Sequence, residues 1–373
     1  MTRAAYSVQD IKDMLLDRVD QVAHAYAPAV PSSYTRKGRY FTLNPGRIDR
    51  HVGSFYIYVT GSKKGRWQDH ATGDYGDIID LIALSLRCDN AGAIRAARGF
   101  LGLENEDPAA KARHREMIER SRRNQREAAR ADAKKRECRA RQAQAIFLGA
   151  SDQLRNSPVD LYLRGRGINL AELGRQPGVI RFAPECYCSQ IDEETGQVFE
   201  GKYPAMVAAV TNYKGEFVAV HRTYLAPTED GGWTKAPIPK PKKVLGDYPG
   251  AAINVWRGIG PRGGKPVSLP QCAPGTHVFV TEGIEDALSV VSLNPELRVI
   301  AAISLGNMAG LQLPAAVHQI TFVADKDENE EARAALNRAL EEHNTSGRTV
   351  RLWQNRWGGK DLNDALQSAQ GAA

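Results

Sequence analysis

The sequence lacks the features that would place a protein in a membrane or send it out of the cell. Its 373 residues contain no apolar stretch long enough to cross a bilayer, and the first residues do not follow the layout of a signal peptide. No segment matches a Walker A phosphate loop, which argues against ATP-driven translocation. We therefore expect a cytoplasmic protein with no membrane partner.

Cysteine is scarce, and its spacing does not suit metal binding. The five cysteines are odd in number and include no CxxC pair. This usage fits a reducing compartment and argues against a structural zinc ion held by cysteines alone. Cys186 and Cys188 are predicted to be neighbours on a strand instead of ligands.

The positive charge is concentrated in one segment. From Lys111 to Arg141 there are 13 Lys or Arg and 5 Asp or Glu residues, a balance of +8, whereas the whole chain carries +7. The rest of the chain is therefore close to neutral, at −1. Residues 108–150 are predicted to form a basic helical linker. Its charges either add salt-sensitive affinity for phosphate backbones or simply keep a spacer hydrated.

The most informative stretch runs from Val278 to Asp364, where apolar runs alternate with helix-like segments. Strands are predicted at 278–280, 299–304, 320–323 and 350–352, and a turn at Gly306 and Asn307 follows the second of them. Alternation of strands and helices predicts a parallel sheet, whose ligand crevice lies at the carboxyl ends of the strands. Acidic residues follow three of these strands, so we expect their side chains to meet at one edge.

The acidic residues at this edge indicate metal-dependent phosphoryl transfer. Converging carboxylates repel one another unless a hard cation such as Mg²⁺ shares them with substrate phosphates. Asp325 and Asp327 are predicted to hold the metal, while Glu282 either orients a hydroxyl or completes the coordination. For Asp327, a solvated position at the start of a helix is an alternative.

These residues also carry a family resemblance. The segments TEGIEDALS, SLGN, VADKDEN and GGKDLND resemble the Toprim domain, the fold shared by bacterial DnaG-type primases, type IA and type II topoisomerases and some nucleases. The resemblance implies that Glu282 is the acidic residue of the first motif and that Asp325 and Asp327 are its DxD pair. Mg²⁺ or Mn²⁺ is the implied cofactor.

Two further acidic positions follow from the same resemblance. Asp286, one helical turn after Glu282, and Asp361 match acidic residues of the primase branch. The last motif departs from the replicative primases, which more often have a second Asp where this chain has Asn363. Asn363 and Asp364 therefore both remain candidates for the final position.

Residues 151–270 resemble the N-terminal half of a primase catalytic core. The shared elements are YLRGRGI, a hairpin strand AVHRTYL and the lysine-bearing loop KAPIPKPKKVLGDYPGA. The side chains predicted to contact nucleotide or DNA phosphates are basic, although a solvated surface loop would look similar. They are Arg164, Arg166, Arg222, Lys235, Lys240, Lys242 and Lys243, with Lys360 from the last acidic cluster.

Residues 1–107 are predicted to form a small hairpin and helix module. Its first helix is expected over 6–25, with Ser7 and Asp10 in a capping box. The tail GDYGDIIDLIALSL resembles the zinc-ribbon module of the same primases, in which cysteines and a histidine hold zinc. Here Asp69 and Thr72 stand near those positions, so no zinc is expected. Aromatic and basic residues such as Tyr40 and Trp67 either stack on single-stranded nucleic acid or are ordinary core and surface.

Together these patterns predict an α/β and α+β multidomain protein. The expected domains are 1–107, the linker 108–150, a nucleotide-binding subdomain 151–270 and a Toprim catalytic domain 271–373. The resemblance implies a DNA-directed RNA polymerase of the primase type, acting on single-stranded DNA template with ribonucleoside triphosphates in a phage, plasmid or other mobile element. A replicative helicase is an implied partner.

Two other functions fit the same sequence. One is a Toprim nuclease or strand-cleaving enzyme that uses the metal site with water, Tyr162 or Tyr224 as the nucleophile. The other is a DNA-binding protein without catalytic activity.

Overall fold

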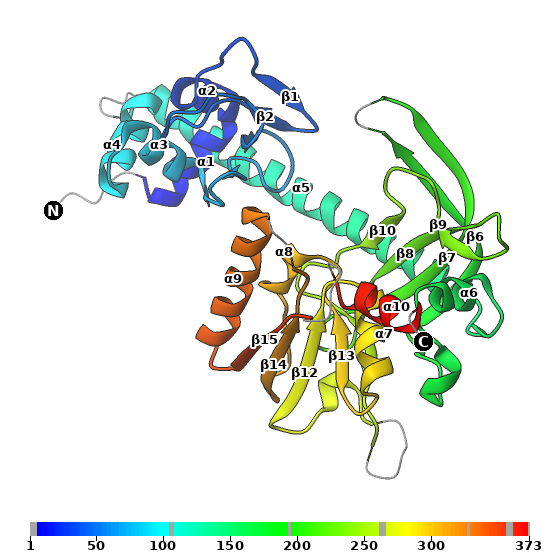
Figure 1. Ribbon diagram of the computed structural model, residues 1–373. Coiled ribbons are helices and arrows are strands. Elements are labelled where there is room, and N and C mark those ends of the chain that lie inside the picture. Colours follow the sequence, from blue (N-terminus) through cyan, green and yellow to red (C-terminus); the bar gives the residue numbers. More distant parts are fainter. Residues whose placement is uncertain are drawn as a thin grey trace. The chain divides into compact units, whose positions relative to one another are not determined.

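The computed structural model describes residues 6–103, 108–192, 195–260, 266–326, 329–355 and 361–371 (Figure 1). The chain divides into two compact units, Met1–Lys135 and Arg136–Ala373. Within the described ranges, no helix combines the length and the apolar character needed to span a membrane.

The N-terminal unit begins with two helices where the sequence predicts one. Helix α1 spans Val8–Asp17 and α2 spans Val19–Tyr26. The predicted capping box is present, because Ser7 and Asp10 exchange side-chain and backbone hydrogen bonds. The prediction of a single helix over 6–25 is wrong at Arg18, whose φ of −109° and ψ of 30° leave helical geometry.

A five-stranded antiparallel sheet follows, in the order β1-β2-β3-β4-β5. The predicted hairpin is confirmed, since β3 and β4 pair around the 61–65 turn. Helices α3 and α4 pack on one another and on α1. The bounds are β1 Tyr34–Arg36, β2 Arg39–Phe41, β3 Phe55–Tyr58, β4 Trp67–Asp69, β5 Tyr75–Gly76, α3 Ile78–Leu86 and α4 Asn90–Leu101.

The aromatic residues of this sheet lie on two different faces. Tyr40 and Trp67 belong to the buried core of the unit. A cross-strand row on the other face joins Tyr34, Phe41 and Tyr56, and Tyr34 stacks on Phe41 at 4.8 Å between ring centres. The guanidinium of Arg39 lies over the rings of Phe41 and Tyr56. In this row Tyr34 is exposed, whereas Phe41 and Tyr56 are buried.

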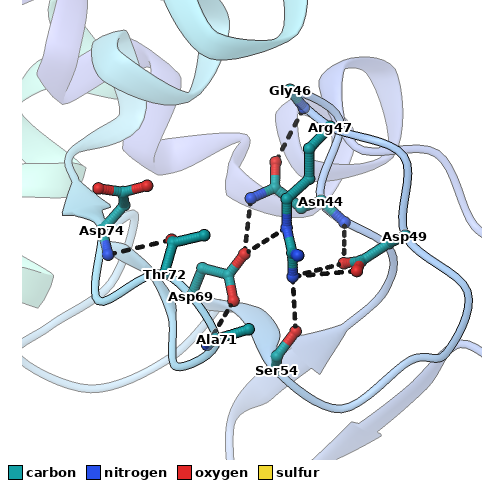
Figure 2. A network of polar contacts seen from close by, with 9 residues as sticks. All are labelled: Asn44, Gly46, Arg47, Asp49, Ser54, Asp69, Ala71, Thr72 and Asp74. Atoms are coloured by element: carbon teal, nitrogen blue, oxygen red, sulfur yellow. Dashed lines mark hydrogen bonds and ion pairs between the residues drawn. The ribbon is translucent and has the colours of Figure 1, made fainter. Parts of the chain in front are cut away.

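Asp69, at the end of β4, is the centre of a buried polar network (Figure 2). Its carboxylate accepts hydrogen bonds from Asn44 Nδ2 (2.8 Å), Arg47 Nε (3.1 Å) and the Ala71 backbone N–H (2.9 Å). Burial alone would raise the pKa of Asp69, but these bonds and the charge of Arg47 hold it below its usual value. The network joins the 44–54 loop to the turn after β4.

Helix α5, Pro108–Leu148, contains the basic segment. A helix is confirmed here, but the prediction of a solvent-exposed linker is wrong at both ends. Met117 and Ile118 are buried in the N-terminal core, and Arg122 pairs with Asp13. At the other end Ala143 is buried in a core of the second unit. The boundary between units therefore lies inside α5.

After the end of α5, the second unit continues with α6, Pro158–Gly165, and the 3-10 helix Leu170–Leu173. An antiparallel sheet follows in the order β10-β8-β7-β6, with β9 paired to β8. The predicted hairpin is confirmed as β7 and β8. The predicted basic loop is partly wrong, because it contains β9 and β10. The bounds are β6 Ile180–Ile191, β7 Val198–Thr211, β8 Phe217–Pro227, β9 Trp233–Lys235 and β10 Lys242–Gly246.

The C-terminal sheet has the order β11-β13-β12-β14-β15, and a 3-10 helix, Leu269–Gln271, precedes it. Its last four strands are parallel, as predicted, whereas β11 is an unpredicted antiparallel edge strand. The bounds are β11 Ile253–Arg257, β12 Thr276–Thr281, β13 Arg298–Ala301, β14 Val317–Val323 and β15 Thr349–Trp353.

Helices cover both faces of this sheet (Figure 1). Residues of α7 share one core with the 151–255 part, and residues of α9 share another with β12 and β14. The predicted turn at Gly306 and Asn307 is instead the short helix α8. The bounds are α7 Ile284–Leu293, α8 Leu305–Met308, α9 Glu330–Thr345 and α10 Leu362–Gly371.

Candidate active site

Two of the predicted acidic residues meet at one edge of the C-terminal sheet. Glu282 directly follows β12, and Asp325 lies two residues after β14. The two strands are parallel neighbours, and Val280 pairs with Phe322. Glu282 and Asp325 line one small cavity, as does Arg333 from α9. The structure thus places the two carboxylates at a shared cavity.

The backbone next to Glu282 is held by the neighbouring strand end. The Ile303 N–H donates to the Glu282 carbonyl at 2.9 Å, and the Thr281 hydroxyl donates to the Gly283 carbonyl at 2.8 Å. Ile303 has a φ of 78°, which β-branched residues rarely adopt. Such conformations persist only where the surroundings enforce them, and they cluster at functional sites.

Asp286 and Asp361 complete the described part of the acidic group. Asp286 lies in the first turn of α7, and Asp361 lies just before α10. Burial, followed by the charges of Asp361 and Asp325, raises the pKa of Asp286 to about 7. The Asp286 carboxylate is therefore close enough to Asp361 and to Asp325 to be repelled by both. The predicted site residues Asp327 and Lys360 lie outside the described residues.

The chemistry of this group suits a hard divalent cation. Among the described residues, no three His, Cys, Asp or Glu side chains are already arranged to hold a metal ion. The repulsion that raises the pKa of Asp286 is nevertheless what a cation would relieve, and carboxylate oxygens are the ligands that Mg²⁺ prefers. Glu282, Asp286, Asp325 and Asp361 are the residues that could hold it.

Asn363 and Asp364, the two candidates for the final motif position, differ in their hydrogen-bond partners. The side chain of Asn363 is fully buried and donates from Nδ2 to the Arg166 carbonyl (2.8 Å) and to Ser289 Oγ (2.9 Å). Its backbone N–H donates to Asp286 Oδ1 at 3.2 Å. The Asp364 N–H donates to Asp361 Oδ1 at 2.7 Å. Asn363 thus fixes the carboxylate of Asp286 in place.

Sequence reasoning missed a buried acidic residue beside this group. Glu285 is 4% exposed and receives hydrogen bonds from Tyr162 Oη (2.8 Å) and Lys242 Nζ (3.0 Å), while Lys235 Nζ lies at 3.5 Å. Burial would raise the pKa of Glu285, but Lys242 and Lys235 hold it well below its usual value. The signal was present in the TEGIED motif, whose second glutamate falls on the buried side of α7.

The predicted basic residues separate into two groups. Lys242 and Lys243 are consecutive on β10, so they point to opposite faces of the sheet. Lys242 reaches Glu285, whereas Lys243 donates to the Ser189 carbonyl at 2.9 Å and is paired in register with Arg222. Arg222 in turn donates to the Tyr187 carbonyl.

Three predicted residues remain on or near α6 and the loop before β10. Arg164 forms an ion pair with Asp160 at 2.9 Å. The Lys240 N–H donates to Gln190 Oε1 at 3.1 Å. Arg166 contributes its charge to the surroundings of Lys235, and its buried Nε has no hydrogen-bond partner among the described residues. Lys235, Lys242 and Arg166 therefore lie together beside Glu285, which precedes Asp286 of the acidic group in the chain.

Neither candidate tyrosine is placed to act as a nucleophile. Tyr162 and Tyr224 are 2% and 0% exposed. The hydroxyl of Tyr162 is bound to Glu285, and that of Tyr224 donates to the Tyr187 carbonyl at 2.9 Å. Burial raises the pKa of both groups well above the usual range. A protonated, buried phenol cannot attack a phosphodiester.

Several solved structures are similar to this chain at low identity. The Aquifex aeolicus primase, comprising zinc-binding and RNA polymerase domains, shares 14% identity over 97% of this chain and 84% of its own, with a TM-score of 0.36. A DnaG primase catalytic domain bound to ssDNA shares 15% identity over 64% and 81%, with a TM-score of 0.40. The E. coli primase catalytic core shares 14% identity over 62% and 78%, with a TM-score of 0.36.

Comparison with protein families gives two matches. Residues 137–255 match a domain of unknown function, DUF7146, and residues 277–372 match the family described as Toprim domain. No curated protein matches the chain. The second match contains Glu282, Asp286, Asp325 and Asp361, and it confirms the resemblance seen in the acidic motifs. The C-terminal segment of this chain, residues 277–372, is a Toprim domain.

Proposed function

We propose that this protein is a DNA primase that synthesises short RNA primers on single-stranded DNA by metal-dependent phosphoryl transfer. The observation that carries the proposal is a pair of adjacent groups of opposite charge. Carboxylates of the Toprim domain lie at the sheet edge. Lys242 lies beside them, because its Nζ is 3.9 Å from the position that a Cβ atom on Gly283, the residue after Glu282, would occupy. Polymerisation of nucleoside triphosphates needs both groups.

The acidic residues would hold Mg²⁺ or Mn²⁺. When bound, such an ion neutralises the charge that develops on the reacting phosphate and lowers the pKa of a coordinated hydroxyl. Glu282 and Asp325 would supply oxygen ligands from the ends of two neighbouring parallel strands, and the Asn363 N–H would keep Asp286 oriented.

The basic residues would bind the triphosphate. Three cations, Lys235, Lys242 and Arg166, surround the single negative charge of Glu285, so this cluster carries a net positive charge next to the carboxylates. The exposed part of the basic helix α5 and the face of the N-terminal sheet that carries Arg39 and Tyr34 would bind template through phosphates and stacking. We further propose a role in the replication of a mobile element, with a replicative helicase as partner.

A primer-synthesis assay with labelled ribonucleotides, single-stranded DNA and Mg²⁺ tests this function. We expect the wild-type protein to make short oligonucleotides and Asp325→Ala to lose at least about 100-fold in rate, because charge stabilisation in the transition state is lost. Binding of single-stranded DNA should stay within about twofold of wild type, since the basic surfaces are unchanged.

The same assay separates the alternatives. Cleavage of the template without synthesis would identify a nuclease, and binding alone would identify a DNA-binding protein without catalytic activity. Asp247→Asn, outside the acidic group, serves as the matched control and should synthesise at the wild-type rate. Retention of synthesis by Asp325→Ala would refute the assignment of this site.

A further inference from the structure

Glu285 connects three elements of the nucleotide-binding part to the first turn of α7. Tyr162 comes from α6, Lys235 from β9 and Lys242 from β10, and all three converge on its carboxylate. The residue after Glu285 is Asp286, a member of the acidic group. A single buried carboxylate therefore fixes two lysines next to the proposed metal ligands.

The two lysines keep hydrogen-bonding capacity after they bind Glu285. An ammonium group has three N–H donors, and the contacts with Glu285 take one from each lysine. The side chains of Lys235 and Lys242 remain 34% and 38% exposed, whereas that of Glu285 is 5% exposed. The remaining donors are thus accessible to a ligand that Glu285 itself cannot contact freely.

A third cation, Arg166, belongs to the same cluster as the two lysines. Arg166 lies near enough to shift the pKa values of Lys235 and Tyr162, and its buried Nε lacks a hydrogen-bond partner among the described residues. A buried donor without an acceptor is costly in free energy. Together these cations offer a polyphosphate several donors within one small region.

We propose that Glu285 is a positioning residue for the polyphosphate of the incoming nucleotide. By binding one donor of Lys235 and one of Lys242, it holds both ammonium groups where their free donors meet the triphosphate. Flexible lysine side chains lose conformational entropy when a ligand orders them. Because Glu285 already restricts both lysine side chains, less conformational entropy is lost when the triphosphate binds. The inference rests on the proposed function, because it assumes a nucleoside triphosphate as substrate.

The direction of the effect separates positioning from simple charge balance. Coulomb's law alone predicts that removal of the negative charge of Glu285 tightens the binding of an anion. Positioning predicts the opposite, because Lys235 and Lys242 then repel each other and lose their common anchor. The sign of the change in affinity therefore decides between the two.

The test measures the binding of inorganic triphosphate to the full-length protein in EDTA, by isothermal titration calorimetry. We expect Glu285→Gln to weaken binding about tenfold, which corresponds to the loss of one hydrogen bond to a charged group. Tyr162→Phe keeps every charge but removes the hydroxyl that holds Glu285, and it should weaken binding about two- to threefold. With ribonucleotide as substrate, KM should rise more than kcat falls.

Glu185→Gln is the matched control, because Glu185 is the exposed partner of Lys202 at 2.9 Å. It should bind triphosphate like the wild type. Tighter or unchanged binding by Glu285→Gln, or no binding by the wild type, overturns the inference. If thermal unfolding shows that Glu285→Gln does not fold, wild-type affinity in Tyr162→Phe is the overturning result. Primer synthesis needs metal and template, so the proposed function is judged separately by its own assay.

Discussion

At the residue scale, the raised pKa of Asp286 gives the metal-free protein a measurable pH dependence. Burial and the charges of Asp361 and Asp325 raise this pKa to about 7, whereas an unfolded aspartate titrates near ~3.9. The folded state therefore binds more protons between these values, and stability is lost as the pH rises through about 7. We expect the free energy of unfolding in EDTA to fall by about 1 kcal/mol between pH 6.5 and 8.5.

Urea denaturation of the wild type and of Asp286→Asn at several pH values in this window checks the expectation. The variant should show a flatter dependence, because its amide does not titrate. Burial lowers the pKa of His221 to about 4, and its opposing effect fades as the pH rises above ~6.5, where an unfolded histidine loses its proton. This effect is common to the wild type and the variants, so it cancels when their slopes are compared. Asp152→Asn, an exposed aspartate, should behave like the wild type. Equal slopes in all three proteins would show that Asp286 is not the titrating group.

At the element scale, the strands that the sequence predicts best are those that consist mainly of apolar residues. Phe279, Val280 and Phe322 lie in mainly apolar segments that end shortly before an acidic residue, and their strands are parallel as expected. The edge strand β11 was missed because Ile253 and Trp256 stand among loop residues, and its pairing depends on β13, which lies far along the chain. Long-range pairing of this kind leaves no local signal.

The missed chemistry has the same origin. Lys235 and Lys242 were placed on a proline-rich loop, but they lie in strands paired with β8. Their partner Glu285 belongs to an α7 turn that sequence reasoning treated as ordinary helix. A buried ion pair is specified by two distant segments at once, so neither segment reveals it alone. The strand-end carboxylates were predictable because each follows its own apolar run.

Helix α5 offers a prediction at the same scale. Arg123, Arg126 and Arg130 are exposed on the stretch between its two buried ends. If this stretch binds single-stranded DNA, each phosphate contact releases counterions, with a slope of about −0.7 per contact in a plot of log affinity against log salt. Replacing all three arginines by glutamine should reduce the slope by about 2, measured by fluorescence anisotropy with an oligothymidylate.

The control for this helix neutralises an equal number of exposed cations elsewhere, at Lys202, Lys214 and Arg338. Its salt slope should match the wild type. Glutamine is a good helix former, so α5 itself should persist in the variant. An unchanged slope in the arginine variant would mean that the charges only keep the helix hydrated.

At the scale of the whole molecule, the boundary between units lies at 135 and 136, within α5, and not before it. A truncation that removes residues 1–107 leaves Met117 and Ile118 without the N-terminal core that buries them. A truncation that removes residues 1–135 also removes these apolar side chains. We expect the shorter fragment, 136–373, to be the more soluble of the two, because it exposes less apolar surface.

The same fragment tests whether the site is self-contained. Every described residue of the acidic group and of the Glu285 cluster lies in 136–373, so the fragment should bind inorganic triphosphate in EDTA within about twofold of the full chain, since distant segments contribute independently. Its affinity for single-stranded DNA should fall, because the exposed arginines of α5 and the aromatic face of the N-terminal sheet are gone. A fragment that folds, as judged by circular dichroism, but loses triphosphate would show that the N-terminal unit contributes directly to nucleotide binding.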